Sequence, residues 1–75
     1  MIIGVPKEVK KNEYRVGLTP KSVSKLTSYN NTVFVEKGAG SSIGYADLDY
    51  QKSGATILES PKELYGSSEL IVKVK

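Results

Sequence analysis

The sequence contains no cysteine, no histidine and no tryptophan among its 75 residues. Without cysteine no disulfide framework can form, and this absence points weakly to a reducing compartment. Without cysteine and histidine, almost every kind of zinc site is excluded. A Ser-His-Asp arrangement is excluded too, so we do not interpret the serines as nucleophiles.

Long apolar runs are also missing from the sequence. The longest unbroken apolar stretch is far shorter than the ~20 residues that a bilayer-spanning helix needs. No charged leader followed by a long apolar segment opens the chain, so we expect no secretory signal. These absences predict a cytoplasmic protein without a membrane partner.

The formal net charge of +3 comes from 11 basic and 8 acidic residues scattered along the chain. Only Lys7, Lys10 and Lys11 form a local basic cluster, and Glu8 and Glu13 dilute it. A nucleic-acid footprint requires clustered positive charge, with interleaved aromatic residues for single strands. We therefore expect no nucleic-acid partner.

Short apolar runs alternate with helix signals. Thr19 before Pro20 combines an N-cap with proline at the first helical position, and Ser60-Pro61 with Glu63 resembles a capping box. The predicted elements are strand 1–5, a helix from 19 that ends at 30–31, strand 32–36, helix 46–53, strand 55–58, a helix from 60 through 65 and strand 70–74. This β-α-β-α-β-α-β order predicts an α/β protein with a Rossmann-like or flavodoxin-like parallel sheet and right-handed crossovers.

The sequence stops directly after the last predicted strand, without a helix to cover the far side of the sheet. A chain of this length buries only about 60% of the surface that it exposes when unfolded, so it is marginal by itself. In open α/β sheets, ligands bind at the carboxyl ends of the strands. We expect a partial domain, a piece of something larger that ends at a functional surface.

A charged segment, residues 7–18, matches neither a helix nor a strand pattern and contains the only arginine of the chain, Arg15. Loops of this kind between rigid elements often carry binding groups. Arg15 can be a solvated surface residue, as charged side chains mostly are. It can also be a planar fork of donors aimed at a small carboxylate, a task that suits arginine better than lysine. The residues alone leave both interpretations open.

The segment lies within a closely spaced signature, read as Gly4-x-Pro6-x-Glu8, Asn12-Glu13, Arg15-Val16, Thr19-Pro20, Val23 and Leu26. This pattern resembles the N-terminal signature of the alanine dehydrogenase and pyridine-nucleotide transhydrogenase family. The similarity continues through residues 36–40 and 54–55 to Lys73-Val74-Lys75, so it covers essentially the whole chain. The family usually has Ala at the position of Gly17, and this change loosens the backbone without removing any chemistry.

The resemblance implies that residues 1–75 are the N-terminal part of a substrate-binding (catalytic) domain. In the alanine dehydrogenase branch, L-alanine is oxidised to pyruvate and ammonia with NAD as the hydride acceptor. Arg15 and Lys75 match the two family positions that hold the carboxylate and the keto oxygen of pyruvate, or the matching groups of alanine. Lys75 also favours this branch, because transhydrogenases usually carry a different residue there.

The family's catalytic His and Asp and its NAD-binding domain lie beyond Lys75. We therefore expect no catalytic residue, cofactor site or metal site within the 75 residues, and no activity from them alone. Glu8, Asn12 and Glu13 also match the signature, and we expect them to order the loop around Arg15 through hydrogen bonds and ion pairs. Family members typically form homohexamers, so the resemblance implies a homo-oligomer.

Residues 38–44 read Gly-x-Gly-x-x-x-Gly between a predicted strand and a predicted helix, which is the context of a dinucleotide-binding fingerprint. The third glycine falls one position late, with Ile43 where the fingerprint requires it. The acidic residue expected about 20 residues further on is met only loosely by Glu59 or Glu63. We therefore interpret this loop as a tight turn.

Three alternatives stay open. The chain can belong to the soluble alpha subunit of an NAD(P) transhydrogenase, which a continuation lacking the catalytic His would favour. It can be a truncated module that binds a partner or assembles with itself through uncovered strand edges, which an unusual oligomeric state would favour. It can also bind a nucleotide through its glycine-rich loop, which tight NAD binding by the 75 residues would favour.

Overall fold

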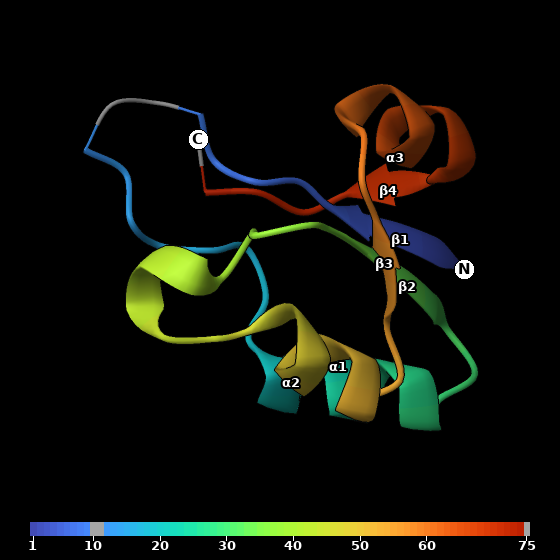
Figure 1. Ribbon diagram of the computed structural model, residues 1–75. Coiled ribbons are helices and arrows are strands. Elements are labelled where there is room, and N and C mark those ends of the chain that lie inside the picture. Colours follow the sequence, from blue (N-terminus) through green and yellow to red (C-terminus); the bar gives the residue numbers. More distant parts are fainter. Residues whose placement is uncertain (10–11, 75) are drawn as a thin grey trace.

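The computed structural model describes residues 1–9 and 12–74, which form one parallel sheet with helices on both faces (Figure 1). The elements are β1 (Ile2–Val5), α1 (Pro20–Ser28), β2 (Thr32–Glu36), the 3-10 helix η1 (Ser41–Ile43), α2 (Asp47–Lys52), β3 (Thr56–Leu58), α3 (Pro61–Ser67) and β4 (Leu70–Ile71). The predicted α/β class, the parallel sheet and the order of the main elements are confirmed.

The strands lie in the order β3-β2-β1-β4, and every neighbouring pair is parallel. From β1 through β3 the chain moves toward one edge, with α1 and α2 on one face of the sheet (Figure 1). Then α3 crosses the other face and leads to β4 at the opposite side of β1 (Figure 1). A right-handed crossover requires this change of face when the direction reverses. The carboxyl ends of the neighbouring strands β1 and β4 therefore mark a topological switch point, which is the place where open α/β sheets bind ligands.

The main core lies between the sheet and the α1/α2 layer. Ile3 and Val5 of β1 pair in register with Val33 and Val35 of β2, and all four side chains belong to the same buried cluster. Their spacing of two places them on one face of the sheet. Burial of each such side chain contributes about 1.5–3 kcal/mol, so the β1–β2 pair is the firm centre of the fold.

Helix α1 begins and ends where the sequence predicts. Thr19 is its N-cap, and the Thr19 hydroxyl accepts a hydrogen bond from the backbone N–H of Ser22 at 3.2 Å. Pro20 occupies the first turn, where its missing N–H costs nothing. Asn30 then adopts a left-handed conformation with φ 67° and ends the helix.

Two predicted boundaries are wrong. Helix α3 continues through Gly66 to Ser67, and β4 ends at Ile71 instead of residue 74. The N–H of Val72 still donates to the carbonyl of Gly4 at 2.9 Å. Beyond that point the partner strand β1 has ended, and Pro6 offers no N–H for continued pairing.

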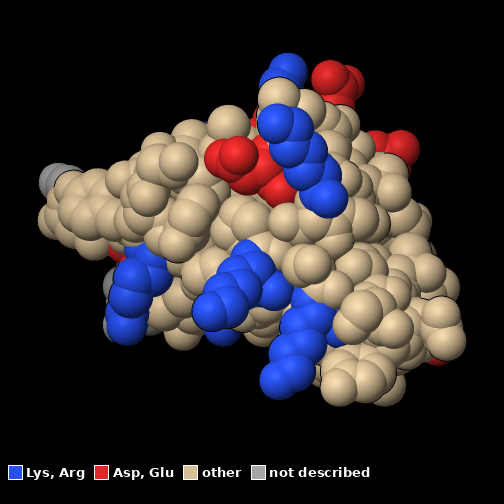
Figure 2. Space-filling model, turned by 90° about the horizontal axis from the view of Figure 1, so that it is seen from below, with Lys and Arg blue, Asp and Glu red and all other residues tan. Residues whose placement is uncertain are grey.

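On the side of α1 and α2, the described surface carries charges of both signs, with acidic side chains gathered beside one basic side chain (Figure 2). Seen from that side, several basic side chains stand apart from one another with uncharged surface between them (Figure 2). Within residues 1–9 and 12–74, no helix has the length and apolar character to cross a bilayer.

Candidate functional site

The loop between β1 and α1 follows the carboxyl end of the central strand and is fixed near both ends. At its beginning, the backbone N–H of Lys7 donates to Oε1 of Glu36 at 2.9 Å. Near its end, Val16 is buried in the core, and the carbonyl of Leu18 accepts a hydrogen bond from the hydroxyl of Tyr50 at 2.8 Å. Both ends of the loop are therefore anchored to the rest of the fold.

Tyr50 is the buried support of this loop. Its side chain is fully buried, and its ring meets that of Tyr45 edge to face with a centroid distance of 6.3 Å. Burial raises the pKa of Tyr50 to about 12, and Tyr45, Asp47 and Asp49 add to the effect. The hydroxyl therefore stays protonated and continues to donate to Leu18 at every physiological pH.

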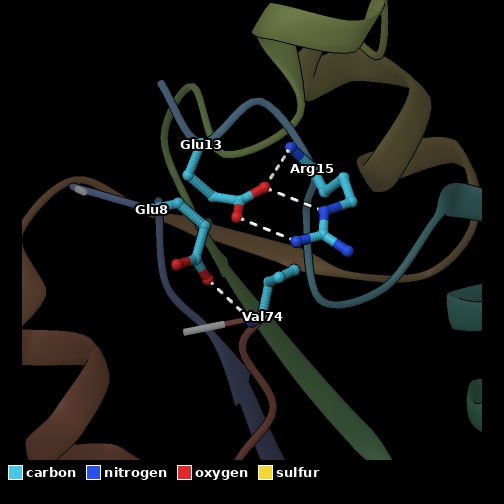
Figure 3. A network of polar contacts seen from close by, with 4 residues as sticks. All are labelled: Glu8, Glu13, Arg15 and Val74. Carbon is cyan, nitrogen blue, oxygen red and sulfur yellow. Dashed lines mark hydrogen bonds and ion pairs between the residues drawn. The ribbon is translucent and has the colours of Figure 1, made fainter. Parts of the chain in front are cut away.

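Glu13 binds Arg15 through three hydrogen bonds (Figure 3). Oε2 of Glu13 accepts from both the backbone N–H and the Nε–H of Arg15 at 3.0 Å, and Oε1 accepts from Nη2 at 3.1 Å. The side chain of Glu13 is only 7% exposed, whereas that of Arg15 is 69% exposed. The hydrogen bonds and the charge of Glu13 raise the pKa of Arg15, so the guanidinium stays charged.

The contact with Glu13 uses one edge of the guanidinium. A guanidinium has five N–H donors in a planar fork, and Glu13 takes the Nε–H and one N–H of Nη2. Within residues 1–9 and 12–74, the Arg15 side chain makes no other hydrogen bond. The Nη1–Nη2 edge is therefore available for a bidentate pair with a ligand carboxylate.

Glu8 connects this loop to the segment that follows β4. Oε2 of Glu8 accepts a hydrogen bond from the backbone N–H of Val74 at 2.9 Å, across 66 positions of sequence. Figure 3 shows the Val74 side chain directed toward Arg15, with Glu8 and Glu13 on the loop beside it. Beyond the paired residues of β1 and β4, the β1–α1 loop and the segment after β4 are therefore joined by the Glu8 side chain rather than by strand pairing.

Gly17 brings the same two segments into close contact. A Cβ atom on Gly17 would meet the carbonyl oxygen of Val72 and would lie 2.9 Å from its carbonyl carbon and 3.1 Å from the Cα atom of Lys73. All three atoms belong to the backbone, which cannot turn aside as a flexible side chain can. Glycine therefore permits an approach that any other residue would obstruct.

Of the predicted site residues, the structure brings Glu8, Glu13 and Arg15 together. Asn12 occupies the turn of the loop with φ 66°, a conformation that asparagine tolerates, and its Oδ1 accepts from the hydroxyl of Tyr14 at 3.3 Å. Lys75 lies outside the described residues.

The glycine-rich loop does not fit the phosphates of a dinucleotide. The N–H of Gly38 donates to Oδ1 of Asp47 at 2.8 Å. The N–H groups of Ala39 and Ser41 donate to the carbonyls of Glu36 and Gly38 at 3.0 and 3.2 Å. Three of the N–H groups that could face a phosphate are thus engaged, and the Asp47 carboxylate would repel an anion. This geometry agrees with the interpretation of the loop as a tight turn.

The arrangement is suited to binding an anion, and proton transfer would need further groups. Within the described part of the chain, no three His, Cys, Asp or Glu residues gather where they could hold a metal ion. The chain contains no histidine, and the carboxylates of Glu8 and Glu13 are engaged in the hydrogen bonds described above.

Two residues that place the loop were missed by sequence reasoning. Tyr50 acts on a backbone carbonyl 32 positions away, and a contact with a backbone group leaves no pattern in the sequence. Gly17 carried a signal, because the family usually has Ala there. We interpreted that departure as added backbone freedom, whereas the structure shows a close approach to Val72.

A parallel sheet with an arginine beside its switch point has the arrangement of an open α/β domain, a fold in which ligands bind at the carboxyl ends of the strands. Residues 4–75 match the family described as "Alanine dehydrogenase/PNT, N-terminal domain". The chain belongs to this family, which confirms the resemblance carried by its N-terminal signature.

The chain is 49% identical to the alanine dehydrogenase of Bacillus subtilis and 45% identical to that of Methanococcus maripaludis, over 75 residues in each case. Among solved structures, it is similar to an L-alanine dehydrogenase, with a TM-score of 0.93 and 49% identity. It is also similar to a transhydrogenase from Sinorhizobium meliloti, with a TM-score of 0.88 and 34% identity. The matches cover all or 97% of this chain but only 20% of each relative. The chain thus spans about a fifth of the length of these relatives.

Proposed function

We propose that this chain is the N-terminal part of the substrate-binding domain of an NAD-dependent L-alanine dehydrogenase. The observation that carries the proposal is the Arg15 guanidinium, which Glu13 holds by one edge beside the switch point of the sheet. The identity of 49% to an alanine dehydrogenase over the whole chain supports the same activity. In that reaction L-alanine, NAD and water give pyruvate, ammonium, NADH and a proton.

In this proposal Arg15 binds the substrate carboxylate through its Nη1–Nη2 edge, as a charge-assisted bidentate pair. Lys75, which follows directly after Val74, would contact the carbonyl oxygen of pyruvate or share the carboxylate. Two fixed contacts define the orientation of so small a substrate, and orientation can supply several kcal/mol of the barrier. The residues of this chain bind and orient the substrate.

The remaining functions of the enzyme would belong to other parts of the protein. The glycine-rich loop of this chain does not fit NAD, so the cofactor would bind to a separate domain. The chain also offers no histidine for acid-base chemistry. We expect a cytoplasmic homo-oligomer in which the 75 residues alone have no dehydrogenase activity.

The test is a chimera in which this chain replaces the matching 75-residue segment of the Bacillus subtilis alanine dehydrogenase. The purified chimera should produce NADH from L-alanine and NAD, and the isolated chain should not. Arg15→Lys keeps the charge but loses the fork, so the KM for pyruvate should rise about 10-fold or more. Lys52→Ala on α2 removes a positive charge away from the loop and is the matched control, with no change in KM expected.

A folded chimera that produces no NADH would contradict the proposal. The same holds if Arg15→Lys leaves the KM for pyruvate at the level of the Lys52→Ala control. Folding is checked by comparing the unfolding temperature of the chimera with that of the parent enzyme.

A second candidate is the soluble subunit of a pyridine-nucleotide transhydrogenase. The similarity to the Sinorhizobium meliloti transhydrogenase, at a TM-score of 0.88, supports it. In that case Arg15 would have no amino-acid substrate to bind. The chimera distinguishes the two candidates, because only the dehydrogenase interpretation predicts an alanine-dependent reaction that is sensitive to Arg15→Lys.

A further inference from the structure

We propose that Glu13 is a positioning residue, which turns Arg15 so that its Nη1–Nη2 edge is the one offered to the substrate carboxylate. The inference rests on the proposed function and adds to it the choice of guanidinium edge. An arginine fork can bind a carboxylate through its Nη1–Nη2 edge or through its Nε–Nη2 edge. Here the Nε–Nη2 edge is already occupied by Glu13.

The geometry fixes the whole side chain of Arg15. One carboxylate oxygen, Oε2 of Glu13, binds both the backbone N–H and the Nε–H of Arg15. The backbone and the guanidinium of Arg15 are thus tied to the same carboxylate oxygen. Glu13 itself is nearly buried, with 7% of its side chain exposed, so it is a fixed support for a side chain that is otherwise mostly in solvent.

Glu13 has two opposing effects on a bound carboxylate. Its negative charge repels the ligand, which would weaken binding. Its hydrogen bonds hold Arg15 in one orientation, which strengthens binding because less side-chain freedom is lost when the ligand arrives. Arg15 is largely exposed, so water and salt screen the repulsion between groups on opposite edges of its guanidinium. We therefore expect positioning to be the larger effect.

The experiment is the substitution Glu13→Gln in the chimera with the Bacillus subtilis enzyme. Glutamine has the same size but only one acceptor oxygen, and its NH2 group takes the place of the other, so Nε and Nη2 can no longer each pair with an oxygen of their own. The KM for pyruvate should rise about fivefold, as expected when a fixed side chain becomes mobile. The kcat and the KM for NADH should stay within about twofold. Glu59→Gln is the matched control, because Glu59 is 81% exposed and its contact with Lys37 is 3.8 Å long.

A double-mutant cycle with Arg15→Lys separates this inference from the proposed function. If Glu13 acts through the fork of Arg15, Glu13→Gln should change the KM less than about twofold in the Arg15→Lys background. An equal effect in both backgrounds would overturn the positioning role and leave the proposed function intact. A lower KM in Glu13→Gln would overturn it as well, since repulsion would then be the dominant effect. If Arg15→Lys itself has no effect, the proposed function fails first.

A second measurement does not depend on activity. The chain has a single arginine, so the NMR spectrum of arginine Nε–H groups in the 75-residue chain contains one signal. The bond to Glu13 should slow exchange of this proton with solvent, and Glu13→Gln should speed the exchange about 10-fold, whereas Glu59→Gln should not. Equal exchange rates in the wild-type chain and Glu13→Gln would refute the fixed orientation.

Discussion

The substitution Gly17→Ala distinguishes two opposite effects of glycine at this position. Gly17 does not have a positive φ, so its backbone conformation is open to alanine. If glycine only loosens the loop, alanine should stabilise the protein by about 0.4–1 kcal/mol, because it restricts the unfolded chain. If glycine is required for close contact, alanine should destabilise it.

The structure supports destabilisation. The new Cβ atom would meet the carbonyl oxygen of Val72 and lie 2.9 Å from its carbonyl carbon. Relief requires the loop and the segment after β4 to move apart, and overpacking of this kind costs about 1–3 kcal/mol. For a domain of this size, 1 kcal/mol corresponds to about 4–8 °C in Tm. We therefore expect Gly17→Ala to lower the Tm by about 4–24 °C.

The assay is thermal and urea unfolding of the 75-residue chain, followed by circular dichroism. Gly66→Ala is the matched control, because Gly66 lies in α3 and a Cβ atom there would meet nothing within 4 Å. It should stabilise the chain by up to about 1 kcal/mol through helix propensity. If Gly17→Ala raises the Tm as Gly66→Ala does, the close contact with Val72 is refuted.

Two further predictions concern the supports of the loop. Glu8→Ala removes the acceptor of the Val74 N–H, so hydrogen exchange at Val74 should become about 10-fold faster and stability should fall by about 1 kcal/mol. Glu8→Gln keeps an acceptor and should behave nearly as wild type, and equal exchange in all three chains would show that the bond is absent. The pKa of Tyr50 is about 12 in the folded chain, against a usual value of 10.0. The contribution of Tyr50 to the free energy of unfolding should therefore be complete below pH 10 and fall between pH 10 and 12. Tyr50→Phe should cost about 1 kcal/mol at pH 8. The free energy of unfolding of the wild-type chain, measured in urea, should fall between pH 8 and pH 11, and this fall should be about 1 kcal/mol smaller in Tyr50→Phe. An equal fall in both chains would contradict this account.

The architecture could be predicted from sequence because its signals are local. The N-cap at Thr19, the proline after it and the β-branched run at residues 32–36 each specify a conformation within a few residues. The boundary of β4 was wrong because it depends on a neighbour. Residues 70–74 form a continuous apolar pattern apart from Lys73, but the strand can pair only as far as β1 extends.

The sequence signature indicated which residues lie near one another in the described part of the candidate site, but not their geometry, and the roles of Arg15 and Lys75 stay predictions. The signature identified Glu8, Glu13 and Arg15, and the structure places all three together. Which edge of Arg15 is occupied depends on side-chain rotamers, which the sequence pattern does not encode. Likewise, Asp47 alternates with apolar neighbours as a solvated residue would, yet its carboxylate accepts the Gly38 N–H nine positions away.

The bond between Glu8 and Val74 has a consequence for the order in which the molecule assembles. It closes a loop of 66 residues, so it can form only after the central strand and the edge strand have met, and such distant contacts are slow to form. Strand β4 pairs with β1 over two residues, Leu70 and Ile71, whereas β2 pairs with β1 over four, so the edge strand has the fewer strand contacts with β1. If a substrate contacts both Arg15 and Lys75, as proposed above, it would favour the assembled sheet and by mass action hold the edge strand in place.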